Sequence, residues 1–96
     1  MYGTVARLRL KPGTEQKMAE LLRSYEALKV DGYTRSMLYR MDKDSNELYL
    51  TVVFENKEKY EKNANSPEQD KRYQEMVSLL DGEPEWHDGE IIYPIS

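Results

Sequence analysis

Hydrophobic and polar residues alternate along two segments of this chain and recur at helical spacing along others. Alternation with a period of two is typical of a strand that buries one face. Residues 2–10 and 47–55 show it, and residues 33–41 and 85 to about 95 are also expected to form strands. Apolar residues three and four positions apart are typical of an amphipathic helix. They recur between residues 14 and 31 and between residues 66 and 81, and a shorter helix is expected from Asn56 through Asn63.

Turn and capping residues separate these segments. Lys11-Pro12-Gly13 ends the first strand, and Thr14 is a suitable N-cap for the helix that follows. The run from Asp42 to Asn46 has the length of a hairpin loop. Ser66-Pro67-Glu68-Gln69 is a capping box with proline at the first helical position. The last helix is therefore expected to begin there, and Asp81-Gly82 is expected to end it.

The order strand–helix–strand–strand–helices–strand is that of the ferredoxin-like βαββαβ fold. It predicts an α+β fold in which an antiparallel four-stranded sheet carries its helices on one face. No internal repeat or linker interrupts the pattern, so residues 1–96 are expected to form a single domain.

The face of the sheet without helices carries apolar residues among polar ones. Val5, Tyr49 and Val53 would form a patch there, and such patches often mark interfaces. Pairing two of these faces would bury both, so a homodimer through this face is expected; a solvated sheet face is the alternative. Arg9 and Glu47 fall on the same face of neighbouring strands and could pair.

Composition and charge exclude several classes of function. The net charge is −4, and the 14 basic residues are interleaved with acidic ones, so nucleic acid is not an expected partner. No apolar run approaches the length of a membrane span, and the first residues do not resemble a signal peptide, so a cytoplasmic protein is expected. The absence of cysteine removes disulfides, thiol catalysis and thiolate metal sites.

Metal binding is not indicated by the remaining motifs. The loop that begins at Asp42 resembles the start of a calcium-binding loop, but Glu47 and Val53 stand where a glycine and a bidentate glutamate are needed. A single histidine, His87, cannot build a typical zinc site. His87 is a candidate general base if it faces a substrate, and a half-exposed surface residue otherwise.

Several aromatic and polar residues are candidates for lining a ligand cavity between the sheet and the helices: Tyr25, Tyr60, Asn63, Tyr73, Met76 and Trp86. A phenol on the apolar stripe of a helix can pack against a flat ligand and offer it one hydrogen bond. Core packing is the alternative role for each tyrosine. Asn63 is either an amide that orients a substrate or a residue of the turn after a short helix.

Several runs of residues lie in the order expected of one known family: Lys11-Pro12-Gly13-Thr14 after the first strand, Gly32-Tyr33, Leu38-Tyr39-Arg40, the strand from Leu48 to Phe54 with Glu55-Asn56-Lys57-Glu58, and Ser66-Pro67-Glu68. Over nearly its whole length the chain resembles the antibiotic biosynthesis monooxygenase (ABM) family. The resemblance implies a homodimeric α+β barrel with a cavity between sheet and helices in each subunit. Members include cofactor-independent oxygenases of phenolic polyketides or quinols, haem-degrading enzymes, isomerases, and proteins without known activity.

The haem-degrading branch of the family can be compared residue by residue. The resemblance places Ala6, Asn63 and Tyr73 where that branch has its asparagine, its tryptophan and its iron-binding histidine. All three differ, so haem degradation is not expected, although tyrosine can ligate haem iron.

Two functions remain open. The first is a cofactor-independent oxygenase for a small aromatic or quinol-type molecule, with Tyr73, Asn63 and His87 as catalytic candidates and neither cofactor nor metal. The second is a non-catalytic ligand-binding or stress-related protein with the same fold. A cavity with converging polar groups would favour the first, and a cavity filled by side chains would favour the second.

Overall fold

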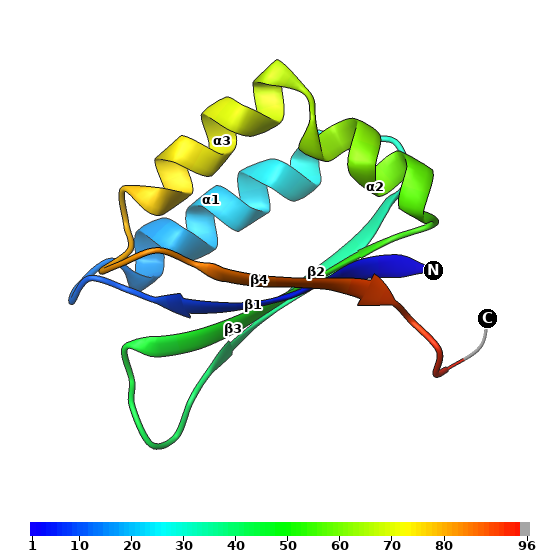
Figure 1. The fold of residues 1–96 in the computed structure, drawn as a ribbon. Helices are drawn as coiled ribbons and strands as arrows, with labels where there is room; N and C mark the ends of the chain where they lie inside the picture. The colour runs from blue at the N-terminus through cyan, green and yellow to red at the C-terminus, as the bar shows by residue number, and fades with distance from the viewer. Residues whose placement is uncertain (95–96) are drawn as a thin grey trace.

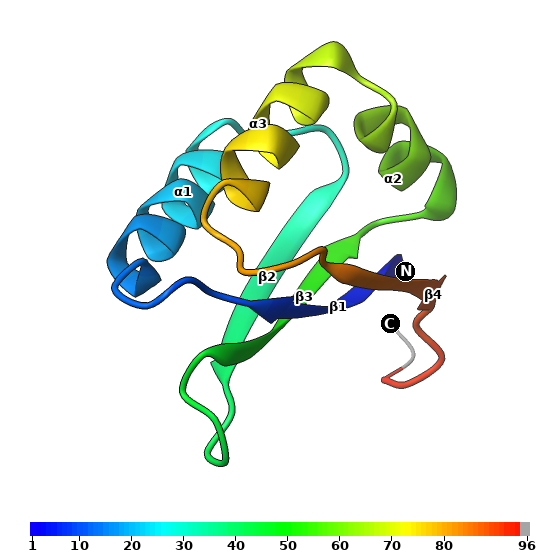
Figure 2. The ribbon, with the colours of Figure 1, turned by 60° about the vertical axis from the view of Figure 1, so that its left-hand side comes forward.

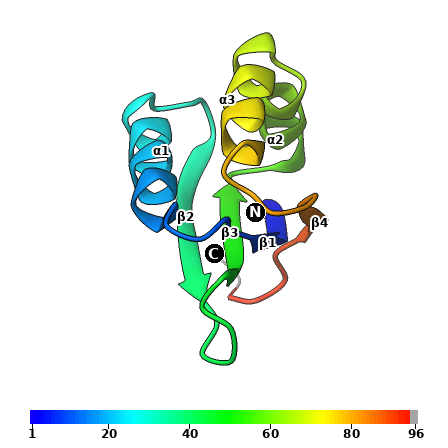
Figure 3. The ribbon, with the colours of Figure 1, turned by 90° about the vertical axis from the view of Figure 1, so that its left-hand side faces the viewer.

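The computed structural model describes residues 1–94. Within this range the elements follow one another in the predicted order: β1 (Tyr2–Arg9), α1 (Glu15–Ala27), β2 (Tyr33–Arg40), β3 (Glu47–Phe54), α2 (Lys57–Ala64), α3 (Pro67–Val77) and β4 (Glu85–Glu90). The strands form one antiparallel sheet in the order β2-β3-β1-β4. The helices lie on the same side of this sheet (Figures 1 and 3). The α+β, ferredoxin-like fold is thereby confirmed.

The helices begin where the sequence predicts, although not all by the predicted contacts. Asn56 Oδ1 accepts a hydrogen bond from Lys59 N at 2.9 Å, and Ser66 Oγ accepts one from Gln69 N at 3.1 Å, so both side chains cap their helices. Thr14 precedes α1 but does not cap it with its side chain. Its hydroxyl instead donates to the carbonyl of Lys11 at 2.7 Å and closes the preceding turn.

β4 is shorter than the strand predicted from residue 85 to about residue 95. β4 ends at Glu90, which pairs with Tyr2, the first residue of β1. One more hydrogen bond runs from Ile91 N to the carbonyl of Met1 at 3.0 Å. Beyond this point β1 offers no further partner, so the ladder stops. The predicted strand end at Ile95 lies outside the described residues.

The apolar core occupies one half of the space between sheet and helices. It consists of side chains from the inner faces of β1 and β3 together with residues of the helices and the loops that follow them: Ala6, Leu8, Leu10, Met18, Leu48, Leu50, Met76 and Leu80. The register sets Leu8 opposite Leu48 and Thr4 opposite Val52. The core therefore fills the half of the inner face near Leu8, and the half near Thr4 and Val52 is left for the cavity described below.

The outer face of the sheet is not covered by any helix of residues 1–94, as the views from three sides show (Figures 1, 2 and 3). Val5, Met37 and Tyr39 are 47%, 40% and 49% exposed on it. The predicted contact between Arg9 and Glu47 is wrong, even though their Cα atoms are partners in the ladder.

The ion pairs of this face run to other partners. Arg9 Nη1 contacts Asp44 Oδ2 in the hairpin loop at 2.8 Å, and Arg7 Nε contacts Glu47 Oε1 at 2.8 Å. Long side chains reach diagonal neighbours across a sheet, so direct opposition of two Cα atoms does not fix the pair. No helix of residues 1–94 is long and apolar enough to cross a membrane.

Candidate functional site

A cavity of about 370 Å³ lies between the inner face of the sheet and the helices. Each strand and helix from β1 to β4 contributes to its lining. Its floor is apolar and includes Leu50, Val52 and Phe54 of β3. Cavities that hold small molecules measure about 300–1,000 Å³, so this one suits a ligand of about two or three fused rings.

The structure brings all six predicted cavity residues together on its walls: Tyr25 from α1, Tyr60 and Asn63 from α2, Tyr73 and Met76 from α3, and Trp86 from β4. The helical stripes explain this gathering. Tyr25 follows Leu21 and Leu22 on the buried stripe of α1, and Met76 lies one turn beyond Tyr73. The cavity is open enough to hold a ligand, and polar groups converge on it.

One corner of the cavity joins α1, α2 and α3 through polar groups. Asn63 Nδ2 donates a hydrogen bond to the hydroxyl of Tyr25 at 2.7 Å. The guanidinium of Arg72 lies over the ring of Tyr25, with Cζ 5.2 Å from the ring centroid. Burial raises the pKa of Tyr25, against the opposing effects of Asn63 and Arg72. The phenol is therefore protonated at neutral pH, and its proton has no acceptor among residues 1–94.

A second phenol of the lining is bonded to β4. The Tyr60 hydroxyl donates to Asp88 Oδ1 on β4 at 2.8 Å. Burial raises the pKa of Tyr60 strongly, and the hydrogen bond and negative charge of Asp88 raise it further. Thr4 lies near enough to offset part of this rise, but its buried hydroxyl does not reach hydrogen-bonding geometry with any group in residues 1–94. Tyr60 thus commits its proton to Asp88.

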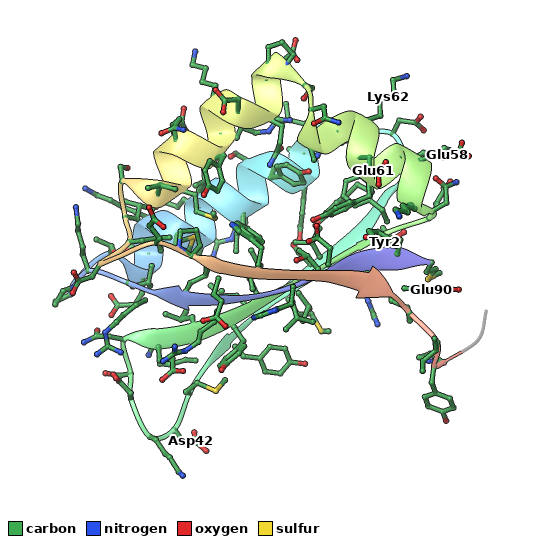
Figure 4. The ribbon with its side chains drawn as sticks, in the orientation of Figure 1. Tyr2, Asp42, Glu58, Glu61, Lys62 and Glu90 are labelled. Carbon is green, nitrogen blue, oxygen red and sulfur yellow. The ribbon has the colours of Figure 1, made fainter. Side chains whose placement is uncertain are left out.

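A continuous row of aromatic rings forms one wall. Tyr25 meets Tyr33 with centroids 5.2 Å apart, Tyr33 meets Phe54 at 5.8 Å, and Phe54 meets Tyr60 at 5.5 Å, each close to edge-to-face. Tyr2 extends the row at 5.2 Å from Tyr60. In Figure 4 Tyr2 lies between α2 and the sheet, whereas Glu58 and Lys62 project from α2 away from it. Edge-to-face packing of this kind holds the wall rigid.

The remaining phenols of the cavity differ in their bonding. The Tyr33 hydroxyl shares a hydrogen bond of 2.7 Å with Ser36 Oγ. The Tyr73 ring lies 6.1 Å from that of Trp86. The tyrosine hydrogen bonds inside the cavity involve Tyr25, Tyr33 and Tyr60, and none involves Tyr73 within residues 1–94. Tyr25 and Tyr73 are therefore the phenols that can serve a ligand.

His87 does not join the cavity. It is the cross-strand partner of Val5, so its side chain lies on the outer face of the sheet, where Nε2 contacts Glu85 Oε1 at 2.9 Å. Its neighbour Trp86 faces inward, and successive residues of a strand point to opposite faces. His87 therefore does not lie where it could act as a general base on a substrate in this cavity. In residues 1–94 no three His, Asp or Glu side chains are grouped as metal ligands.

Several lining residues were not predicted from the sequence, above all Gln69 and Arg72. Arg72 Nε donates to Gln69 Oε1 at 3.2 Å. A signal was present, because residues 69, 72, 73 and 76 are spaced by three and four positions and share one face of α3. The apolar stripe predicts a buried face only from Tyr73 onward, because Gln69 and Arg72 are polar.

Comparison with known proteins places the chain in a family. The model of the family described as antibiotic biosynthesis monooxygenase matches residues 1–77. The chain belongs to the antibiotic biosynthesis monooxygenase family. The matched part contains β1 through α3 and every predicted cavity residue except Trp86. No curated protein matches the sequence significantly.

Solved structures share the fold of this ABM protein at low sequence identity. A conserved protein from Methanosarcina mazei Go1 is 20% identical with a TM-score of 0.76, covering 92% of this chain and 89% of that one. SnoaB, a cofactor-independent oxygenase from Streptomyces nogalater, is 14% identical with a TM-score of 0.76, covering 98% and 97%. Rv0793 from Mycobacterium tuberculosis is 18% identical with a TM-score of 0.76, covering 99% and 98%. Such identities establish the fold alone.

Proposed function

We propose that this ABM protein binds a small, flat aromatic or quinol-type molecule in the cavity and oxidises it with O₂ without a cofactor. The observation that carries the proposal is the corner formed by Tyr25, Asn63 and Arg72, where a free phenolic proton meets a cationic group in an apolar cavity. A purely structural cavity would have no need of converging donors. The likeness in fold to SnoaB, a cofactor-independent oxygenase, supports the same reading.

A reaction without a cofactor, as proposed here, has no added electron source. The substrate itself must supply the four electrons that reduce O₂: a quinol and O₂ give a hydroxyquinone and water, with one oxygen atom entering the ring and the other leaving as water with two of the quinol's hydrogens. The ionised form of a phenol or quinol gives up electrons more readily than the neutral form. The hydroxyl of Tyr25 and the charge of Arg72 would stabilise that anion. The apolar floor would exclude water and hold the ring in one plane. Tyr73 and Asn63 are the proposed groups for guiding the substrate's proton and oxygen.

Oxygen uptake tests this proposal. The probe is naphthalene-1,4-diol, whose spontaneous oxidation is measured first and subtracted. The protein is expected to accelerate O₂ consumption, and isotopically labelled O₂ should leave label in the organic product, which separates an oxygenase from an oxidase. Tyr25→Phe removes the free proton but keeps the ring, and should slow the catalysed rate by about tenfold or more. Tyr93→Phe, at a residue that is 86% exposed, is the matched control and should change nothing.

The alternative is a ligand-binding protein of the same fold without catalysis. Saturable binding of the diol with O₂ consumption no faster than in buffer would favour it. Absence of both binding and uptake would count against either use of the cavity.

We also propose that the chain forms a homodimer through the outer face of the sheet, around Val5, Tyr49 and Val53. Val5 is 47% exposed there in the single chain, beside the exposed Met37 and Tyr39. An apolar patch of this kind on an uncovered sheet face is typical of an interface. His87 would then lie in the interface and not beside a substrate in its own subunit.

A further inference from the structure

Arg72 is a half-buried cation in the cavity wall without a carboxylate partner in residues 1–94. Its Nε donates to the neutral amide of Gln69, and its Cζ lies over the ring of Tyr25, 5.2 Å from the ring centroid. The hydrogen bond uses one nitrogen of the guanidinium. It leaves the two terminal nitrogens with no acceptor among the described residues.

Several other cations are paired with acids. Arg7 contacts Glu47 and Arg9 contacts Asp44, and Lys59, which is half-buried like Arg72, contacts both Glu55 and Asp31. Water can serve an exposed cation, but a half-buried one gains more from a fixed partner. The partner of Arg72 is therefore expected to enter with the ligand.

We infer that the ligand of this cavity is an aromatic carboxylate, whose carboxylate pairs with Arg72; the inference rests on the proposed binding function of the cavity. The guanidinium presents two parallel N–H groups that match the two oxygens of a carboxylate. The contact with the Tyr25 ring and the hydrogen bond to Gln69 restrain the guanidinium before a ligand arrives, so less freedom is lost on binding.

One acidic residue, Asp70, also lines the cavity and would repel an anion. Its side chain is exposed, so water screens its charge, whereas Arg72 is half-buried. This difference favours a carboxylate held inward beside Arg72 and Tyr25, with the aromatic rings over the floor formed by Val52 and Phe54. The formal charges of Arg72 and Asp70 cancel, so the half-buried position of Arg72, and not a net charge of the cavity, is what favours an anion there.

Paired probes of equal shape test the inference. Binding of 2-naphthoate, an anion at neutral pH, is compared with that of 2-naphthamide, its neutral counterpart, by calorimetry. The indole N–H signal of Trp86 in a proton–nitrogen correlation spectrum reports whether each probe enters the cavity, because the chain has one tryptophan and it lines the cavity. The protein is expected to bind naphthoate about tenfold more tightly, which corresponds to about 1.4 kcal/mol.

Three variants identify the group responsible. Arg72→Gln should bind the two probes equally, and Arg72→Lys should keep part of the preference because it retains the charge but not the fork. Lys71→Gln removes the same charge from an exposed position of the same helix and should leave the preference intact. Spectra of each variant show whether it is folded, and Arg72→Lys tests the inference if Arg72→Gln does not fold.

The outcomes separate this inference from the proposed function. Equal binding of both probes to the unaltered protein, or tighter binding of the amide, would overturn the inference while leaving an aromatic-binding cavity in place. A preference that survives in Arg72→Gln would also overturn it. If neither probe binds at millimolar concentration, the ligand cavity and the inference fail together.

Discussion

Removing one hydroxyl from Tyr60 should weaken the fold without weakening ligand binding. The change Tyr60→Phe keeps the ring and its edge-to-face contact with Phe54, with centroids 5.5 Å apart. It deletes the 2.8 Å hydrogen bond that ties α2 to Asp88 on β4. Because the Tyr60 proton is already committed to Asp88, the hydroxyl is not a donor that a ligand could use.

The size of the effect follows from the surroundings of the two groups. Hydrogen bonds to charged groups contribute about 1.5–3 kcal/mol, but Asp88 is exposed and water can replace the lost donor. We therefore expect a loss of about 1 kcal/mol in the free energy of unfolding at neutral pH. For a chain of this length such a loss lowers the midpoint of thermal unfolding by about 4–8 °C.

The pH dependence supplies a sharper test than the magnitude. The pKa of Tyr60 is raised in the folded state above its unfolded value of about 10. The stability linked to this phenol is therefore fully present below about pH 10 and is lost as the pH rises from there toward the folded pKa, because the unfolded chain ionises first. Burial also raises the pKa of Tyr25 and Tyr33, but both proteins share those residues, so their contributions cancel in the difference.

The assay is urea unfolding of both proteins in steps from neutral pH to about pH 11, above the unfolded pKa of tyrosine. The difference between them should stay constant up to about pH 10 and then shrink. A difference that does not change across this range would refute the argument, since Tyr60 would then bind its proton equally in both states. Adding Asp88→Ala completes a double-mutant cycle, and additive losses would show that the 2.8 Å contact contributes nothing.

Three further outcomes are expected. Tyr73→Phe should weaken binding or turnover of a phenolic or quinol ligand by about 1–2 kcal/mol, measured by calorimetry; unchanged binding and stability would assign Tyr73 to packing. Val53→Asp should shift a dimer toward the 11.3 kDa monomer in sedimentation, because the change places an unpaired charge in the interface. An unaltered protein that sediments as a monomer would contradict the proposed dimer. Haem with a reductant should show no conversion to a linear tetrapyrrole by absorbance, and turnover would contradict the argument from Ala6, Asn63 and Tyr73.

The fold was largely predictable because burial imposes a period on the sequence. Alternation of Thr4, Ala6 and Leu8 with Val5 and Arg7 fixed the inner and outer faces of β1, and the observed burial follows it. The same rule explains why His87 lies on the outer face of the sheet and not in the cavity. Trp86 was predicted to line the cavity, and an adjacent residue on a strand must then face the other way.

Pairing between distant side chains was not predictable in the same way. Asn63 and Tyr25 are 38 residues apart, and Tyr60 and Asp88 are 28 apart. Helical periodicity indicates that Tyr25 faces the sheet, but it does not say which side chain of another helix its hydroxyl will meet. Arg9 shows the same limit on the sheet, where a long side chain passes its direct partner and reaches Asp44.

The tyrosines of the cavity fall into two groups. Some share a hydrogen bond with an acceptor side chain, and others have a hydroxyl proton without an acceptor among residues 1–94. Tyr60 and Tyr33 are engaged with Asp88 and Ser36, so they hold the end of the cavity near α2 and β2 in place. Tyr25 on α1 and Tyr73 on α3 retain protons that residues 1–94 do not use, and Arg72 lies over the Tyr25 ring and next to Tyr73 in sequence. We therefore expect a ligand to bind between α1 and α3, where loss of the Tyr25 or Tyr73 hydroxyl should lower its affinity, whereas loss of the Tyr60 hydroxyl should lower the stability of the fold.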